Sequence, residues 1–284
     1  MPEKTSPKKT PTAQAMLDGW QVPAGGKGFA LAGCDPAARP FSSGDKAADK
    51  ARVAELALEI DALQNLFYAD RRFKLLVLLQ GTDTAGKDGA VRSVFKETCP
   101  LGVHAVAWKA PTETERGHDF LWRIHAQTPL AGEWMIHNRS HYEDVLVPVV
   151  EGWLDEAQTQ QRYAQINDFE RMLGETGTVV LKFMLHISKD EQRERLQKRI
   201  DTPAKRWKFN AADLRARRQW DDYQRAYDAL LRATSTAWAP WTVVPANSKT
   251  HRDLMIATLV RDKLKSLGLR YPDDDPAIKG LVIE

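Results

Sequence analysis

Short apolar segments alternate with longer amphipathic segments along most of the chain. Five apolar runs have the length of buried strands, and they cover residues 73–80, 103–108, 134–138, 178–187 and 241–245. Helical spacing of apolar side chains marks the segments around them, near residues 47–69, 87–98, 114–126, 143–158, 161–174, 189–200, 211–236 and 248–266. Strands that alternate with helices predict an α/β fold, a parallel sheet covered by helices on both faces.

The two ends of the chain differ in composition from its centre. Residues 1 to about 16 are polar with almost nothing to bury, which predicts disorder, and the Gly-, Pro- and Ala-rich text from Trp20 to Asp45 predicts an irregular arm. The domain organisation that we expect is a partly disordered N-terminal arm over 1–45, a core over 46–270 with a basic lid at about 190–220, and a C-terminal tail over 271–284.

Composition excludes several classes of protein. A length of 284 residues suits one large α/β domain, and 43% apolar with 28% charged residues is usual for a globular chain. The two cysteines, Cys34 and Cys99, suggest neither a disulfide framework nor a zinc site. No signal-like segment opens the chain, and no stretch approaches the ~20 apolar residues of a membrane helix. We therefore expect a cytoplasmic protein without a membrane partner.

A glycine-rich loop follows the apolar run 73–80. Its spacing is that of a phosphate-binding (Walker A) loop, except that Asp88 stands where Ser or Thr is usual. Glycines let backbone amides approach an anion, and the helix that follows adds the positive end of its dipole. An ordinary glycine-rich turn is the alternative, but the strand before and the helix after favour phosphate binding. The candidate phosphate-binding residues are Gly81, Thr84, Ala85, Gly86, Lys87, Asp88 and Gly89.

Two carboxylates of this loop, Asp83 and Asp88, would repel a polyphosphate unless a cation lay between them. Magnesium favours one or two carboxylates together with phosphate oxygens. We therefore expect a loop carboxylate, Asp83 in preference to Asp88, to bind the metal in place of the usual Ser or Thr. The alternative for Asp88 is a solvated acid that the helix dipole favours at a helix start.

A second polar cluster follows the apolar run that ends at Asn138. Many phosphotransferases place an Asp at this strand end to hold magnesium, and here the position holds a neutral Asn. Arg139 comes next, and its planar fork of donors suits phosphate. The alternative is that Arg139 forms a structural ion pair with Glu143 or Asp144. Four histidines nearby (118, 125, 137 and 141) are assigned to packing and hydrogen bonding.

The segment from Arg193 to Arg218 is strongly basic. It has ten Lys or Arg against three Asp or Glu, whereas the whole chain has a net charge of +3. Pro203, Trp207 and Phe209 interrupt the run, so it is not a simple solvated helix face, although that is the usual explanation of a charge run. A lid that closes over phosphates needs such cations. Nucleic acid is also a polyanion, so charge alone does not choose between them.

Four motifs together resemble the family 2 polyphosphate kinases. They are QGTDTAGKDG, PTETERGHDFLWRIH, HNRSHYEDVLV and TPAKRWKFNAAD, in this order within about residues 47–265. The resemblance is closest to the class in which Asn replaces the strand-end Asp and SHYEDVL follows. It implies a P-loop kinase-like fold similar to that of thymidylate kinases, in which a parallel sheet lies between helices and a helical lid covers the site.

The resemblance also implies the reaction. It implies a reversible, magnesium-dependent phosphoryl transfer from inorganic polyphosphate to AMP or ADP, and guanine nucleotides and Mn²⁺ are further candidates. We expect a homo-oligomer whose partners are polyphosphate and adenine or guanine nucleotides, without nucleic acid. Two rival functions stay open: an ATP-dependent small-molecule kinase of the same fold, and a non-catalytic polyanion or nucleic-acid binder.

Site residues follow from the matching positions of the motifs. The catalytic candidates are Asp83, Lys87 and Arg139, and the metal candidates are Asp83, Asn138 and Glu143. Because Asn138 is neutral, Glu143 is expected to supply the missing charge. The candidates in the strand-end turn and the lid that bind phosphate or nucleotide are Asn138, Arg139, Arg199, Lys205, Arg206 and Lys208. Lys109, Arg116 and Arg123 are expected to line a polyphosphate groove, unless they form salt bridges with acids of their own segment.

Overall fold

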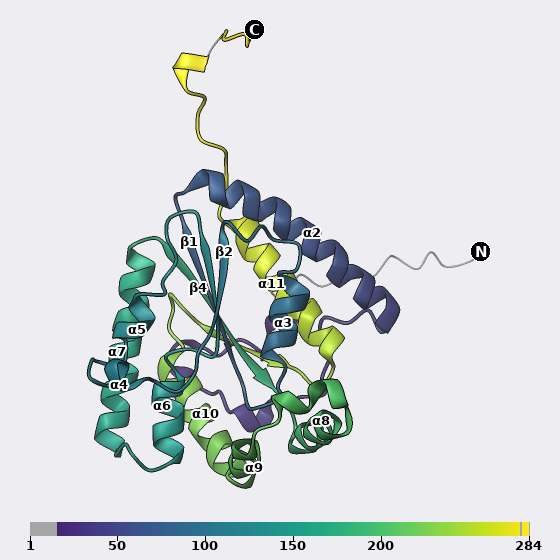
Figure 1. The fold of residues 1–284 in the computed structure, drawn as a ribbon, viewed down its shortest axis with the longest axis vertical. Helices are drawn as coiled ribbons and strands as arrows, with labels where there is room; N and C mark the ends of the chain where they lie inside the picture. Colours follow the sequence, from purple (N-terminus) through teal and green to yellow (C-terminus); the bar gives the residue numbers. More distant parts are fainter. Residues whose placement is uncertain (1–15, 279, 284) are drawn as a thin grey trace, which may run out of the picture.

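A five-stranded parallel sheet forms the centre of the computed structural model, which describes residues 16–278 and 280–283 (Figure 1). The strands lie in the order β2-β3-β1-β4-β5, and each neighbouring pair is parallel. Their bounds are β1 (Lys74–Gln80), β2 (Val103–Ala107), β3 (Trp134–Asn138), β4 (Thr178–His186) and β5 (Trp241–Pro245). The predicted α/β fold with a P-loop kinase-like sheet is therefore confirmed.

Strand β1 lies in the middle of the sheet and is apolar on both faces. Leu75, Val77 and Leu79 pack into one hydrophobic cluster, and Leu76 and Leu78 pack into the other. Successive side chains of a strand point to opposite faces, so a continuous apolar run is what a strand covered on both sides requires. This burial holds the carboxyl end of β1, where the glycine-rich loop begins, in a fixed place.

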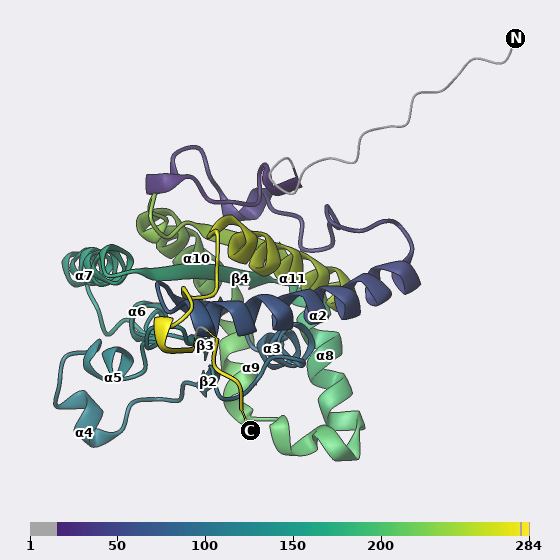
Figure 2. The same cartoon turned by 90° about the horizontal axis from the view of Figure 1, so that it is seen from above.

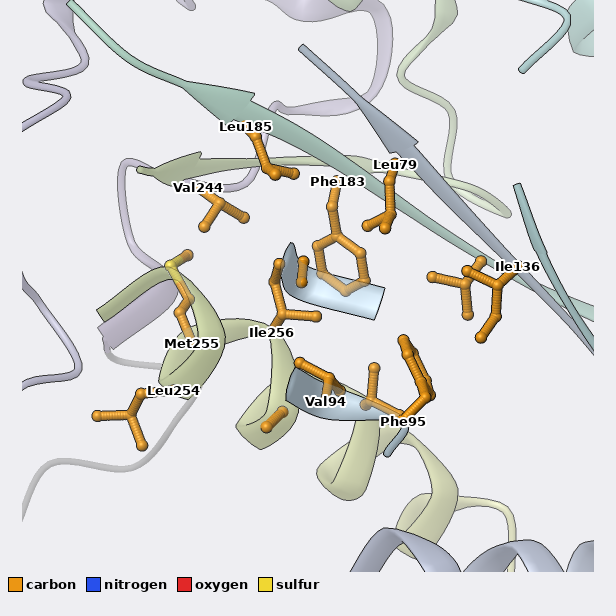
Figure 3. Close-up of a cluster of buried hydrophobic side chains, with 14 of the residues drawn as sticks. Leu79, Val94, Phe95, Ile136, Phe183, Leu185, Val244, Leu254, Met255 and Ile256 are labelled. Atoms are coloured by element: carbon orange, nitrogen blue, oxygen red, sulfur yellow. The ribbon is translucent and has the colours of Figure 1, made fainter. Parts of the chain in front are cut away.

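Helices cover both faces of the sheet (Figure 2). One face carries α2 (Lys46–Asp70), α3 (Lys87–Val94) and α11 (Lys249–Ser266), and the other carries α6 (Glu143–Val150), α7 (Glu156–Glu175) and α10 (Trp220–Thr234). Figure 3 shows the first cluster, in which Leu79 and Phe183 of the sheet face Val94 of α3 and Ile256 of α11. The carboxyl ends of the strands point toward α8 (Lys189–Asp201) and α9 (Ala211–Arg218).

Three predicted helices are shorter than expected because local signals interrupt them. The expected helix 211–236 is two helices, α9 and α10, with a break at Gln219. The expected helix 143–158 ends at Val150, and α7 starts afresh behind a capping box made by Asp155 and Gln158. The segment 114–126 holds two single turns, α4 (Glu113–Arg116) and α5 (Trp122–His125).

The ends of the chain lie on and beyond this core. Between residues 16 and 45 the chain follows the outer side of β5 and α10 through two short turns, η1 (Ala24–Gly26) and η2 (Leu31–Gly33). The predicted disorder concerns residues that mostly lie outside the described part of the chain. After Tyr271 the tail extends away from the core through η4 (Pro276–Ile278) (Figure 1). No helix among the described residues is long and apolar enough to span a membrane.

Candidate active site

The glycine-rich loop turns tightly at the carboxyl end of β1. Gly81 and Gly86 have φ angles of 146° and 106°, which side chains rarely tolerate. A Cβ atom at Gly86 would lie 2.0 Å from Nη1 of Arg252, and one at Gly81 would lie 2.6 Å from the carbonyl oxygen of Leu185. The backbone conformation therefore favours glycine at both positions, and at Gly81 the close approach of the Leu185 backbone requires it as well.

Arg195 of α8 holds the loop from its buried side. Its Nη1 donates to the carbonyl oxygens of Thr84 (2.9 Å) and Ala85 (3.0 Å). Its Nη2 donates to the carbonyl oxygens of Ala246 (2.7 Å) and Asn247 (3.0 Å), which follow β5. These bonds satisfy loop carbonyls that would otherwise repel an anion. Helix α8 thus helps to shape the glycine-rich loop.

Lys87 is buried inside the loop. Its Nζ donates to the carbonyl oxygens of Gly81 (2.5 Å) and Thr82 (3.3 Å). Burial, together with the nearby positive charge of Arg139, lowers the pKa of Lys87 to about 8, although Asp83 acts in the opposite direction. Without an anion the ammonium group is thus poorly stabilised, and a bound phosphate would supply the missing countercharge.

Arg139 joins the second polar cluster to the loop. It follows β3 with a φ of 67°, an unusual conformation for a residue other than glycine. Its Nη2 donates to Asp83 (2.7 Å), and its Nη1 lies 3.9 Å from Glu143. The alternative ion pair with Glu143 is therefore present but long, and Asp144 is not a partner. Burial raises the pKa of Glu143 above its usual value, and the positive charge of Arg139 offsets only part of this rise.

Asp88 links three elements of the site. Asn138, at the end of β3, donates its amide to Asp88 Oδ1 (2.7 Å), and Lys208 in the turn η3 (Pro203–Lys208) donates to Oδ2 (3.1 Å). Burial would raise the pKa of Asp88, but these two hydrogen bonds and the charge of Lys208 outweigh it and lower the pKa. Asp88 is thus more than a solvated acid at a helix start.

The structure brings together only part of the expected metal set. Asp83 and Glu143 flank Arg139, whereas Asn138 lies toward Asp88, to which its amide nitrogen donates. Among the described residues no group of three His, Cys, Asp or Glu is arranged to hold a metal. Two hydroxyl oxygens of the loop, Thr82 Oγ1 and Thr84 Oγ1, are buried without a partner. An all-oxygen set of this kind fits Mg²⁺, provided that substrate oxygens complete it.

The four lid candidates have different surroundings. Arg199 pairs with Asp213 (3.3 Å), and Lys208 pairs with Asp88. Lys205 and Arg206 are exposed, and no described carboxylate lies within 4.0 Å of either. These two cations are therefore available to a polyanion without first breaking an ion pair.

Lys249, at the start of α11, belongs to the same basic surface, and the sequence analysis missed it. Its pKa is lowered by burial and then by Arg195, Arg252, Lys198 and Lys205. Such crowding of positive charge marks a place that favours an anion. Its position directly after the buried strand β5 could have revealed it, because ligands bind beyond the carboxyl ends of parallel strands.

Arg123 does not line an open groove as expected. Its side chain is only 6% exposed, and Nη2 donates to Asp144 (2.9 Å) while Nη1 donates to the carbonyl oxygen of Lys109 (2.9 Å). Its guanidinium also lies 5.0 Å from the ring centre of Trp108. The structure therefore gives Arg123 a structural role, whereas Lys109 and Arg116 are exposed.

A cavity of about 210 Å³ opens beside the loop. Asp83 and Arg139 form one wall, and α6, α9 and α10 form the others. Tyr223 and Tyr227, one turn apart on α10, supply aromatic surface, and Asp213 supplies a carboxylate from the lid. Sequence reasoning missed these three residues. The spacing of the two tyrosines on one helix face was a signal, but nothing in the sequence placed that face against the loop.

Comparison with known proteins gives one consistent result. Residues 43–270 match the family described as Polyphosphate kinase 2 (PPK2). The AMP/ADP-polyphosphate phosphotransferase of Meiothermus ruber is 47% identical over 256 residues, 90% of this chain and 96% of that protein. The ADP-polyphosphate phosphotransferase of Rhodopseudomonas palustris is 40% identical over 227 residues, 76% of this chain and 78% of that protein. The crystal structure of polyphosphate kinase 2 from Arthrobacter aurescens TC1 has a TM-score of 0.89 at 44% identity, covering 95% of this chain and 97% of that chain. The chain therefore belongs to the polyphosphate kinase 2 family, as its four motifs predict.

Proposed function

We propose that this polyphosphate kinase transfers phosphoryl groups reversibly from inorganic polyphosphate to AMP and ADP at the junction between Asp83 and Arg139. The observation that carries the proposal is that these two residues both contact each other and line the cavity beside the phosphate loop. One side of the pair offers a buried loop for a phosphate chain, and the other offers a pocket for an acceptor. The relatives named for AMP and ADP support the choice of acceptor.

The acceptor nucleotide occupies the cavity between α6, α9 and α10. Tyr223 and Tyr227 give aromatic surface for a base, and Arg139 faces the phosphate end. A volume of about 210 Å³ is below the ~300–1,000 Å³ of usual ligand pockets. We infer that helix α9 moves outward when a nucleotide enters, with the break at Gln219 as the pivot. Guanine nucleotides remain candidates because a relative that is 34% identical is named as a GDP-polyphosphate phosphotransferase.

Polyphosphate follows the basic surface on the other side of the pair. Lys87 and the amides of the loop hold its terminal phosphates. The chain then continues past Lys205 and Lys249, where positive charge gathers. This route replaces the groove expected near Arg123, and it leaves Lys109 and Arg116 as exposed cations near α4.

Asp83 and Glu143 are the residues that would hold Mg²⁺, with phosphate oxygens completing the shell. When bound, the metal would offset the charge of the phosphates and so lower the electrostatic barrier to their approach. The chain itself contributes position and fixed charge. Lys87 neutralises the transferred group, Arg139 balances the charge that spreads over it, and α6 holds Glu143 beside them.

The test is an assay of ATP formation with polyphosphate as the sole phosphoryl donor and either AMP or ADP as acceptor. ATP formation from ADP, and ADP followed by ATP from AMP, is the expected result. A folded protein that binds polyphosphate but forms no product would favour a polyanion binder. Turnover of small molecules with ATP, and none with polyphosphate, would favour the rival kinase.

A further inference from the structure

A fully buried charged network lies under the turn that carries Arg139. Lys182 of β4 donates to Glu170 of α7 (2.6 Å), to the hydroxyl of Tyr142 (2.9 Å) and to the carbonyl oxygen of Thr234 at the end of α10 (2.7 Å). The hydroxyl of Tyr142 donates to Glu170 (2.7 Å), and His141 Nε2 lies 3.2 Å from the same carboxylate. No part of the Lys182 or Glu170 side chain is exposed.

Such a network is costly in a protein interior. Two charges lose their hydration when they are buried, and the attraction between them seldom offsets the whole free energy of that loss. Apolar residues of similar size therefore often stabilise a fold equally well. Neither Lys182 nor Glu170 lines the cavity. Stability alone therefore gives no reason for charges at this place.

The turn above the network has an unusual backbone that requires support. Arg139 has a φ of 67°, a conformation that costs roughly 1–3 kcal/mol and persists only when the surroundings impose it. The backbone N–H of Arg139 donates to the carbonyl oxygen of Leu79 (3.0 Å), which fixes the start of the turn. His141 and Tyr142 fix its end through Glu170, and Glu143 begins α6 directly afterwards.

We propose that Glu170 and Lys182 are positioning residues for phosphoryl transfer, which act through Tyr142 and His141 to hold Arg139 and Glu143 in place. This inference rests on the proposed roles of Arg139 and Glu143. The network ties β4, α7 and the end of α10 to the turn, so the guanidinium faces Asp83 in one orientation. A displacement of about 1 Å at a reacting centre can lower a rate by as much as ~10²-fold.

Tyr142→Phe is the decisive variant, because it removes only the hydroxyl group that lies between the ion pair and the turn. Asn167→Ala is the matched control: Asn167 lies one turn before Glu170 on α7 and donates to the carbonyl oxygen of Ala233 on α10 (3.0 Å), away from the turn. We expect both variants to melt at similar temperatures. We expect Tyr142→Phe alone to lower kcat, by about 10-fold, with an unchanged KM for polyphosphate.

A double-mutant cycle with Arg139→Ala separates positioning from a general loss of stability. Because Tyr142 acts partly through Arg139, Tyr142→Phe should lower kcat less in the Arg139→Ala background than in wild type, and the remaining loss reports the displacement of Glu143. The paired replacement Glu170→Leu with Lys182→Met should keep the fold and lower kcat as Tyr142→Phe does. Normal kcat in Tyr142→Phe, or a loss that is as large in the Arg139→Ala background as in wild type, would overturn the inference while leaving the proposed site intact. Normal kcat in Arg139→Ala would instead overturn the proposed site.

Discussion

Arg139 donates to the carboxylate of Asp83 over 2.7 Å, although 56 residues separate the two in sequence. The pair closes the gap between the phosphate loop after β1 and the turn after β3, two neighbouring strands. Adjacent parallel strands bring their carboxyl ends together, and this neighbourhood places the two residues within reach of each other. The site is thus a direct consequence of the sheet.

Replacing Arg139 tests whether geometry or charge matters at this position. Arg139→Lys keeps the positive charge but loses the planar fork, whereas Arg139→Ala loses both. We expect kcat to fall by ~10²–10³ in Arg139→Ala, in line with the loss of one preorganised electrostatic group, and nearly as far in Arg139→Lys. Steady-state kinetics on variants with normal melting curves measure this, and full activity of Arg139→Lys would show that charge alone suffices.

The pH dependence should report Lys87. In the free enzyme the pKa of Lys87 is lowered to about 8, so the side chain carries its charge below that pH and loses it above. We expect kcat/KM for polyphosphate to fall as pH rises through about 8. Bound phosphate favours the charged form, so the corresponding fall in kcat should lie at higher pH. Coincident falls in both profiles would mean that another group limits the reaction.

Two arginine variants distinguish a buried ion pair from a surface cation in the same segment. Arg123→Ala leaves Asp144 without its partner in a mostly buried place, and we expect a loss of ~3–5 kcal/mol in the free energy of unfolding. Arg116→Ala, on the exposed helix α4, should change stability by less than ~0.5 kcal/mol. Urea unfolding measures both. An unchanged stability of Arg123→Ala, with weaker polyphosphate use, would restore the groove that the sequence predicts.

The exposed lid cations should govern the use of polyphosphate. Lys205→Ala with Arg206→Ala removes two charges that have no described carboxylate partner, so folding should hardly change. We expect KM for polyphosphate to rise by about 10-fold or more and its dependence on salt to weaken. Arg171→Ala on α7, also exposed, is the control and should behave like wild type. An equal KM for polyphosphate in the lid variant and the control would show that Lys205 and Arg206 are solvated surface residues that do not bind polyphosphate.

The sequence was sufficient for the sheet and for the motifs that meet at its edge. Apolar runs of strand length and the loop spacing 81–89 are local signals. Parallel neighbouring strands place the loops that follow them at one edge of the sheet, so these signals also predict where the site lies.

Tertiary contacts explain what the sequence could not predict. Nothing in the sequence around Arg123 indicates that this side chain would be buried and paired with Asp144. No Gly or Pro marks the break at Gln219. Tyr223, Tyr227 and Lys249 join the site only because α10 and α11 pack beside the loop. The expected homo-oligomer and cytoplasmic location stay predictions.

The central claim is that Asp83 is the protein's main anchor for the metal, with Asp88 serving as a bridge to the lid. A magnesium titration of activity at saturating polyphosphate tests it most directly, on Asp83→Asn, Asp88→Asn and wild type. Asp83→Asn keeps the size of the side chain but loses its hard anionic ligand. We predict that its kcat falls by ~10² or more and that the remaining activity needs more magnesium. Asp88→Asn should keep the magnesium dependence of wild type and lose activity only modestly, because its contacts are with Asn138 and Lys208. An inactive Asp88→Asn beside an Asp83→Asn that titrates like wild type would contradict the account.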